Sequence, residues 1–181
     1  MTRSRRQFLK SGSMVLGGAA SVLAAGCATR GASAYGRRPY VLVHGAWHGG
    51  WCWARVTPAL RAGGHDVHVI TLTGLGDRAH LSRPDIDLDT HIQDVVAYLQ
   101  MEDLSDVVLV GHSYAGMVIT GVADREAPRL RSLVYLDAFV PENGNAMIDF
   151  VAPERRAVLI MSGTETGFMN PLPLKVFGVT D

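Results

Sequence analysis

Apolar and polar residues follow one another in blocks along residues 40–136, and each block has the length of one strand or one helix. Short apolar runs, of the kind that buried strands show, lie at 40–43, 65–72, 106–110 and 132–136. Helix-length segments separate them, at 53–62, at 90–100 and after residue 116. Strands that alternate with helices favour a parallel sheet, so the pattern predicts an α/β fold with flanking helices.

The segment 90–100 has the clearest helical period. Its apolar residues are spaced to form one stripe that would face the sheet, namely Ile92, Val95, Val96 and Leu99. Thr90 and Gln93 stand three apart and predict a capping box that starts the helix at Thr90. The segment 53–62 is expected to form a helix that ends at the glycine pair 63–64.

Residues 1–34 have the character of a targeting segment and are set apart from the fold. The sequence Ser-Arg-Arg-Gln-Phe-Leu-Lys at residues 4–10 has the twin-arginine form. The mildly apolar, glycine-containing run at 14–25 after it is too short to span a bilayer. We therefore expect a twin-arginine signal peptide, and with it an exported protein that is periplasmic, secreted or lipid-anchored.

Two processing sites compete within this leader. Ala-Ser-Ala at residues 32–34 suits signal cleavage before Tyr35. Leu-Ala-Ala-Gly at residues 23–26, directly before Cys27, resembles a lipoprotein box with Ala24 in the place usually taken by Leu. Both alternatives stay open, and a membrane is expected as a partner only through the signal peptide or through a lipid on Cys27.

Composition adds limits on partners. With 48% hydrophobic and 19% charged residues, the chain has an ordinary globular composition. Five of the 17 basic residues lie in the leader, so residues 35–181 hold 12 basic and 17 acidic side chains. This negative balance argues against a nucleic-acid partner. Cys52 has no cysteine outside the leader to pair with and is expected to be a packing residue between two tryptophans.

The most informative motif is Gly-His-Ser-Tyr-Ala-Gly at residues 111–116, between an apolar run and a helix-length segment. A nucleophilic serine needs a sharp strand-to-helix turn that lifts its hydroxyl clear, with small residues two before and two after it. Gly111 and Ala115 fill these positions, although the strict pattern has Gly where Ala115 stands. Ser113 is therefore the predicted catalytic nucleophile.

A second motif, His-Gly-Ala-Trp-His-Gly-Gly-Trp at residues 44–51, comes directly after the apolar run at 40–43. Acyl transfer places negative charge on the carbonyl oxygen, and two backbone N–H donors in a dry site stabilise it by several kcal/mol each. The expected donors of this oxyanion hole are Ala46 and Tyr114.

These two motifs, with Gly-His-Asp-Val at residues 64–67, resemble the α/β-hydrolases related to plant methylesterases and hydroxynitrile lyases, and above all their bacterial secreted esterase-like members. The resemblance covers about residues 39–181. It implies an α/β-hydrolase core at 35–140, the start of a cap at 141–181, and hydrolysis of small or medium apolar esters without a cofactor. Lyase chemistry on cyanohydrins is the alternative within the same fold.

The resemblance also implies a triad in the chain order Ser, acid, His. The chain has seven histidines, all before Ser113: His44, His48, His65, His68, His80, His91 and His112. We therefore expect the C-terminal strands of the fold to be missing and the base to lie beyond Asp181. Asp137 stands where some α/β-hydrolases keep their acid. As it stands the chain is expected to be weakly active or inactive, and a non-catalytic remnant that binds an apolar ligand remains open.

Three further patterns are weaker. The glycine-containing turn at 74–79 formally fits a dinucleotide site, but Pro84 breaks the helix that such a site requires. Asp85, Asp87 and Asp89 imitate the start of a calcium loop that lacks its glycine and its Glu. The pairs of histidines 44 with 48 and 65 with 68 are expected to make local hydrogen bonds. No metal site is therefore predicted.

Overall fold

The computed structural model describes residues 36–166 together with Met169, Pro171, Pro173 and Lys175. The predicted signal peptide, both processing sites and Cys27 lie outside the described residues. In the described part, no helix combines the length and the apolar character that a membrane span requires.

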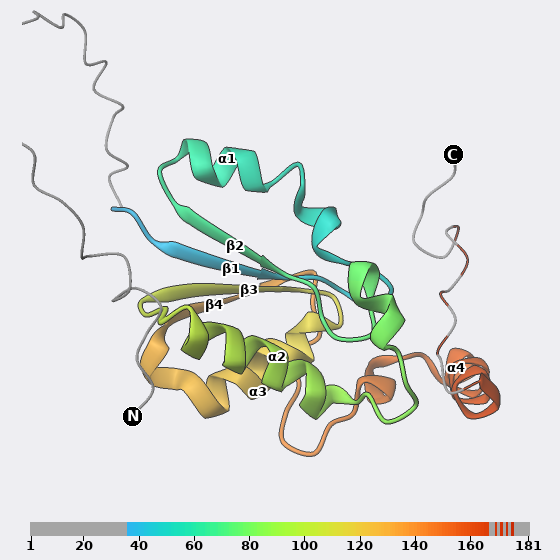
Figure 1. Cartoon of the computed structure of the whole chain (residues 1–181). Coiled ribbons are helices and arrows are strands. Elements are labelled where there is room, and N and C mark those ends of the chain that lie inside the picture. Colours follow the sequence, from blue (N-terminus) through green and yellow to red (C-terminus); the bar gives the residue numbers. More distant parts are fainter. Residues whose placement is uncertain (1–35, 167–168, 170, 172, 174, 176–181) are drawn as a thin grey trace, which may run out of the picture. The chain divides into compact units, whose positions relative to one another are not determined.

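The centre of the fold is a parallel sheet, as the alternating pattern predicts (Figure 1). Its strands lie in the order β2 (Asp66–Ile70), β1 (Pro39–Val43), β3 (Val107–His112) and β4 (Leu130–Leu136), and every neighbouring pair is parallel. The four strands fall on the four predicted apolar runs. Parallel strands all end at the same edge of the sheet, so the loops after β1, β2, β3 and β4 meet there.

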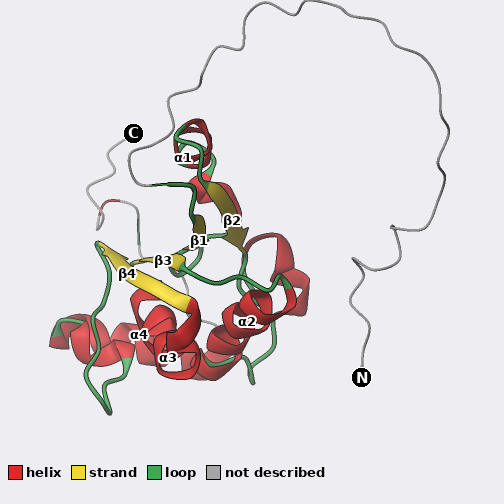
Figure 2. Cartoon of the chain, turned by 90° about the vertical axis from the view of Figure 1, so that its left-hand side faces the viewer, coloured by secondary structure: helices red, strands yellow, loops and turns green. Residues whose placement is uncertain are grey.

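Helices pack on both faces of this sheet. Helices α2 (Leu88–Met101) and α3 (Ala115–Glu126) cover one face, and α1 (Thr57–Ala62) lies on the other (Figures 1 and 2). The short 3-10 turns are η2 (Gly50–Trp53), η3 (Gly76–Leu81), η4 (Ala127–Arg129) and η5 (Met147–Phe150). Helix α4 (Pro153–Thr166) comes after η5, in the segment where the first cap helices are expected. Its role as a cap stays a prediction.

Two helix starts differ from the predictions. The segment expected to be helical from residue 53 forms η2 first, and α1 begins only at Thr57 because Pro58 suits the first turn of a helix. Helix α2 begins two residues before the predicted start, since Asp87 is its N-cap. The Asp87 Oδ1 accepts the Thr90 backbone N–H at 2.9 Å, so Thr90 is the third residue of α2 and the prediction that it starts the helix is wrong.

The core forms two layers because successive residues of a strand point to opposite faces. Under α2 and α3 lie Val41 and Val43 of β1 with Leu109 of β3, and the predicted stripe of α2 is buried against them. On the α1 face, Leu42 packs with Val108 and Val110, and Trp53 and Cys52 complete that layer. Cys52 is thus a packing residue, as its position between two tryptophans predicts, and burial raises the pKa of its thiol.

Candidate active site

Ser113 occupies a sharp turn between a buried strand and a buried helix. Strand β3 ends at His112, α3 begins at Ala115, and Ser113 lies between them with a φ of 54°. A residue with a Cβ is strained in this left-handed region by about 1 to 3 kcal/mol, and such strain persists only where the surroundings impose it. The strand, turn and helix predicted around this serine are therefore present.

Close backbone contacts explain the small residues around Ser113. A Cβ added to Gly111 would lie 2.7 Å from the Ala115 carbonyl oxygen, and one added to Gly116 would lie 1.9 Å from the Phe139 carbonyl oxygen. Neither glycine can therefore carry a side chain without a shift of the backbone. Ala115 is fully buried with its methyl group in place, so the fold accommodates Ala where the strict pattern has Gly.

The loop after β4 holds the turn in place by backbone hydrogen bonds. The Ser113 N–H donates to the Leu136 carbonyl at 3.4 Å, and the Ser113 carbonyl accepts the Phe139 N–H at 3.1 Å. Asp137 lies between these two contacts with a φ of 44° and an exposed side chain. The loop thus brings the Asp137 backbone close to the Ser113 turn in space. The role of Asp137 as the catalytic acid stays a prediction.

The loop after β1 abuts the same turn. A Cβ on Gly45 would lie 3.0 Å from the Ser113 Cβ, so this glycine brings the next residue, Ala46, beside the serine. In the described part of the chain, no acceptor is assigned to the backbone N–H of Ala46 or of Tyr114. Trp47 comes next with a φ of 60°, and with Ser113 and Asp137 it is a third strained residue at this edge of the sheet. Two such donors beside a serine match what an oxyanion hole requires, and the assignment of that role to Ala46 and Tyr114 remains a prediction.

The loops after β1 and β2 touch each other through two glycines. A Cβ on Gly49 would lie 2.9 Å from the Gly76 Cα, and a Cβ on Gly76 would lie 2.7 Å from the Gly49 Cα. Any side chain at either position would therefore push the two loops apart.

His44 is buried and serves the loop structure. Its Nε2 accepts the Leu72 backbone N–H at 3.1 Å, so Nδ1 carries the proton and donates to the Gly45 carbonyl at 2.8 Å. Burial lowers the pKa of His44, which keeps the ring neutral. The expectation of local hydrogen bonds for this histidine is confirmed.

His91 is the second buried histidine, and both of its nitrogens are also occupied. A carbonyl can only accept, so Nε2 donates to the Thr73 carbonyl at 2.9 Å and Nδ1 accepts from the Tyr114 hydroxyl at 2.9 Å. No role was predicted for His91 from the sequence. Its place beside Ile92 on a buried helix face was the one available signal.

Two more histidines lie near the turn. The rings of His48 and His112 are 6.0 Å apart, and the His48 Nδ1 bonds to the Ala46 carbonyl at 2.8 Å. Burial lowers the pKa of His112, the nearby His48 lowers it further, and Asp137 acts in the opposite direction. All seven histidines fall in the described part of the chain, and none of them has a hydrogen bond assigned to Ser113 there.

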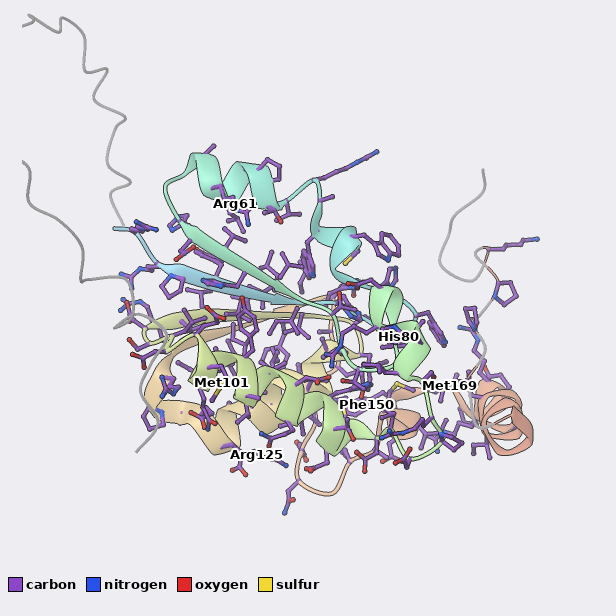
Figure 3. All side chains as sticks on the ribbon, in the orientation of Figure 1. Arg61, His80, Met101, Arg125, Phe150 and Met169 are labelled. Carbon is purple, nitrogen blue, oxygen red and sulfur yellow. The ribbon has the colours of Figure 1, made fainter. Side chains whose placement is uncertain are left out.

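A cleft of about 530 Å³ opens beside Ala46 and Tyr114. Its apolar walls include Trp47, Leu75, Ile86, Leu88, Met147 and Met169. The Trp47 indole N–H donates to the Met169 carbonyl at 2.6 Å and so connects the loop after β1 to Met169. A second hollow runs along the outer side of α2 towards Met101, which lies at the far end of that helix from Met169 (Figure 3).

The alternative sites find no support among the described residues. No group of three or more His, Cys, Asp or Glu side chains there could hold a metal ion. Asp87 is engaged as the N-cap of α2, as expected of a loop that leads into a helix. The glycine turn at 74–79 continues into the short 3-10 turn η3 and not into an α-helix, so the dinucleotide alternative lacks its helix N-terminus.

Comparison with known proteins agrees with this geometry. A family model described as "Alpha/beta hydrolase family" matches residues 40–178. The chain is 51% identical over 150 residues to a carbendazim hydrolyzing esterase of Nocardioides sp., an alignment that covers 77% of this chain and 62% of that protein. It is 35% identical over 108 residues to methylesterase 2 of Arabidopsis thaliana, covering 59% of this chain and 41% of that one.

Among solved structures, an extracellular α/β-hydrolase from a Paenibacillus species is similar with a TM-score of 0.70 and 29% identity, over 77% of this chain and 57% of that chain. This chain thus spans about two fifths to three fifths of the length of these proteins. The resemblance stated from the two motifs is confirmed, and so is the fold class.

Proposed function

Because the chain belongs to the α/β-hydrolase family, we propose that it carries the nucleophile and the oxyanion hole of a carboxylic-ester hydrolase. The observation that carries the proposal is the Ser113 turn, which is strained at a φ of 54°, is followed by Tyr114 and lies against Gly45, the residue before Ala46. The similarity to a carbendazim hydrolyzing esterase and to a methylesterase supports the same chemistry.

In the proposed reaction, the Ser113 oxygen attacks the ester carbonyl and its proton passes to a general base. The carbonyl oxygen becomes negative and accepts hydrogen bonds from Ala46 and Tyr114. The alcohol then leaves with a proton from the conjugate acid, and water releases the acyl group from Ser113 by the same two steps. No cofactor takes part in these reaction steps.

The lining of the cleft supports small or medium apolar esters as substrates. Most of its polar side chains are engaged with protein partners, such as Thr73 with Asp94, His91 with Tyr114, and Arg83 with Asp85, while no partner is assigned to the Ser82 hydroxyl among the described residues. Such a wall offers apolar surface more than hydrogen bonds to a ligand, and 530 Å³ suits a small organic molecule.

We further propose that none of the seven histidines is the general base. His44 and His91 each use both ring nitrogens, and a base must reach the serine hydroxyl with a free nitrogen. His112 neighbours Ser113 on a strained turn, where adjacent side chains point in different directions. The chain of 181 residues should then hydrolyse esters weakly, since loss of one triad member costs about ten-thousandfold.

Hydrolysis of an aryl acetate by the full chain and by Ser113→Ala tests both proposals. We expect little turnover above the variant, and a serine-dependent gain when free imidazole is added as a substitute base. Robust turnover without imidazole that disappears in Ser113→Ala would place a base within these residues and overturn the second proposal. No serine-dependent rate under either condition would favour a binder of apolar ligands that uses the same cleft.

Export by the twin-arginine route is proposed from Arg5 and Arg6, and the extracellular location of the Paenibacillus protein supports it. Replacing both residues with lysine should leave precursor in the cytoplasm. Mass spectrometry of exported wild-type protein should find either Tyr35 as its first residue or a lipid on Cys27. Unchanged export of the double variant would contradict the proposal.

A further inference from the structure

Tyr114 contributes to the candidate site through both its backbone and its side chain. Its backbone N–H is one proposed oxyanion donor, so a role for its anchoring in catalysis rests on the proposed function. Its side chain packs against the core under α2 and α3. The ring meets the His91 ring edge to face, with centroids 5.7 Å apart, and the hydroxyl reaches the His91 Nδ1 at 2.9 Å.

His91 is itself fixed to the loop after β2. Its Nε2 donates to the Thr73 carbonyl at 2.9 Å, and Thr73 is held in turn by Asp94, which accepts the Thr73 N–H at 2.6 Å and its hydroxyl at 2.8 Å. Arg78 donates both to Asp94 at 3.2 Å and to the Thr71 carbonyl at 3.0 Å. The end of β2, helix α2 and the Ser113 turn are thereby joined in one network of hydrogen bonds.

The direction of each proton in this network is set by chemistry. Since His91 must donate from Nε2 to a carbonyl, the tautomer with its proton on Nε2 accepts at Nδ1, and the Tyr114 hydroxyl is then the donor. Burial raises the pKa of Tyr114 well above its ordinary value, so the hydroxyl keeps its proton.

The turn needs such an anchor. Tyr114 is the N-cap of α3, and no side chain caps that helix end. Ser113 before it is strained and would relax if its neighbours allowed it. An oxyanion donor contributes only when its N–H points at the developing charge, so a small rotation of this peptide would weaken it.

We infer that His91 is a positioning residue for the oxyanion hole, acting through the side chain of Tyr114 to fix the direction of the Tyr114 backbone N–H. His91 does not touch the reacting atoms. It sets the geometry of a donor that does, and a wall of the substrate cleft is built from the same contact.

The chain contains a matched control for this inference. Tyr98 on α2 donates to or accepts from the His68 Nδ1 on β2 at 2.9 Å, with ring centroids again 5.7 Å apart. This second pair has the same chemistry and a similar geometry, but neither residue lines the cleft at Ala46 and Tyr114. Tyr114→Phe and Tyr98→Phe therefore each remove one hydroxyl from an equivalent pair.

The experiment uses a p-nitrophenyl alkylphosphonate, which modifies a serine nucleophile once and releases nitrophenolate. In the full chain, with imidazole present, Tyr114→Phe should lower the maximal rate of Ser113 modification about tenfold, a fraction of the hundredfold or greater loss on removing a whole donor. The half-saturating concentration should change little, because the donor acts mainly in the transition state. His91→Gln should behave in the same way, and Tyr98→Phe should match the wild type.

Amide resonances provide a second readout that needs no chemistry at Ser113. Tyr114→Phe and His91→Gln should shift or broaden the backbone amide signals of residues 113–115 in ¹H–¹⁵N spectra, and Tyr98→Phe should leave them in place. If the wild type is not modified at Ser113, the proposed function fails. The spectra still test whether His91 fixes the Tyr114 backbone through the Tyr114 side chain. Unchanged signals of residues 113–115 in both site variants, or equal changes in Tyr98→Phe, would overturn the inference.

Discussion

Strands β3 and β4 are neighbours in one sheet and carry similar apolar residues, yet they lie in different surroundings. In β3, residues 107–111 are buried on both faces, against α2 and α3 on one side and the α1 layer on the other. In β4, Leu133 and Tyr135 pack against the core, whereas Val134 and Leu136 on the other face are 39% and 46% exposed. Within the described residues, β4 also has no neighbour along its outer side.

The strand that leads into the Ser113 turn is thus buried, whereas its neighbour leaves part of the sheet exposed. The turn grows out of the buried strand and is held from the β4 side only by backbone contacts to Leu136 and Phe139, as far as the described residues show. We therefore expect substitutions at the centre of the sheet to act through folding stability. Substitutions on the outer face of β4 should act through association between chains.

The largest effect is expected where the two regions meet. Gly116→Ala would place a methyl group 1.9 Å from the Phe139 carbonyl oxygen, a contact that requires the loop after β4 to move. We expect a loss of at least about 3 kcal/mol in unfolding free energy, measured by urea denaturation. Ala123→Gly on the same helix is the control for a general change in helix propensity, at about 1 kcal/mol. A Gly116→Ala protein as stable as the wild type would mean that the loop does not pack on the turn.

A matched pair of leucines compares the two strands directly. Leu109→Ala in β3 removes a fully buried side chain and should cost about 3 kcal/mol or more through the lost burial and the cavity left behind. Leu136→Ala in β4 should cost less than about 1 kcal/mol, because nearly half of that side chain is already exposed. Chemical denaturation of both variants measures the difference. Equal losses would show that β4 is covered in solution.

A buried histidine at the centre should make stability depend on pH. Because burial lowers the pKa of His44 below its ordinary value of 6.5, the unfolded chain takes up the proton first as the pH falls. The stabilisation is present above pH 6.5 and is lost as the pH falls through the lower pKa of the folded state, by at most about 1.4 kcal/mol per pH unit for one proton.

Denaturation series between about pH 8 and pH 5 test this point. His44→Asn should be less stable at the upper end of that range, where its hydrogen bonds to Leu72 and Gly45 are disturbed, and should show a shallower decline below pH 6.5. His80→Asn, at an exposed position, should keep the decline of the wild type. An unchanged slope in His44→Asn would assign the pH dependence to other groups.

The smallest change in stability is expected on the outer face of β4. Val134→Lys and Leu136→Lys each place a charge on an exposed apolar surface, so unfolding free energy should stay within about 0.5 kcal/mol of the wild type. Light scattering should nevertheless report less self-association, because a charge on an edge strand disfavours pairing with another chain. Met101→Lys, at a position 79% exposed elsewhere, controls for added charge alone. Equal decreases in self-association in all three variants would show that added charge, and not the outer face of β4, causes the change.

The sequence predicted the centre of this molecule better than its edge, for a physical reason. The runs of β1 and β3 are apolar because both faces are buried, and the stripe of α2 has one face to cover, so pattern and environment agree. The run of β4 looks equally apolar, and nothing in it distinguishes covered from uncovered residues. At the candidate site, the strand, turn and helix around Ser113 were predicted from local turn chemistry. No role was predicted for His91, because its partners, Thr73 and Tyr114, come from other elements.

The predictions of helix starts were wrong where more than one residue suited the start of the helix. Asp87 and Thr90 both suit an N-cap, and in the fold they form one capping box in which Asp87 comes first. Pro58 set the start of α1 more firmly than the apolar spacing before it.

The contact between Gly49 and Gly76 restricts how this site can change over generations. Each position excludes a side chain because of the other, so a mutation at one is tolerated only after the opposite loop has moved away. Gly49 belongs to the loop that carries Ala46, and Gly76 begins η3, next to Leu75 in the cleft wall. Changes in the cleft wall and changes in the loop that carries Ala46 are thereby expected to be coupled. Libraries that vary the two loops separately should recover fewer folded members than libraries that exchange them together.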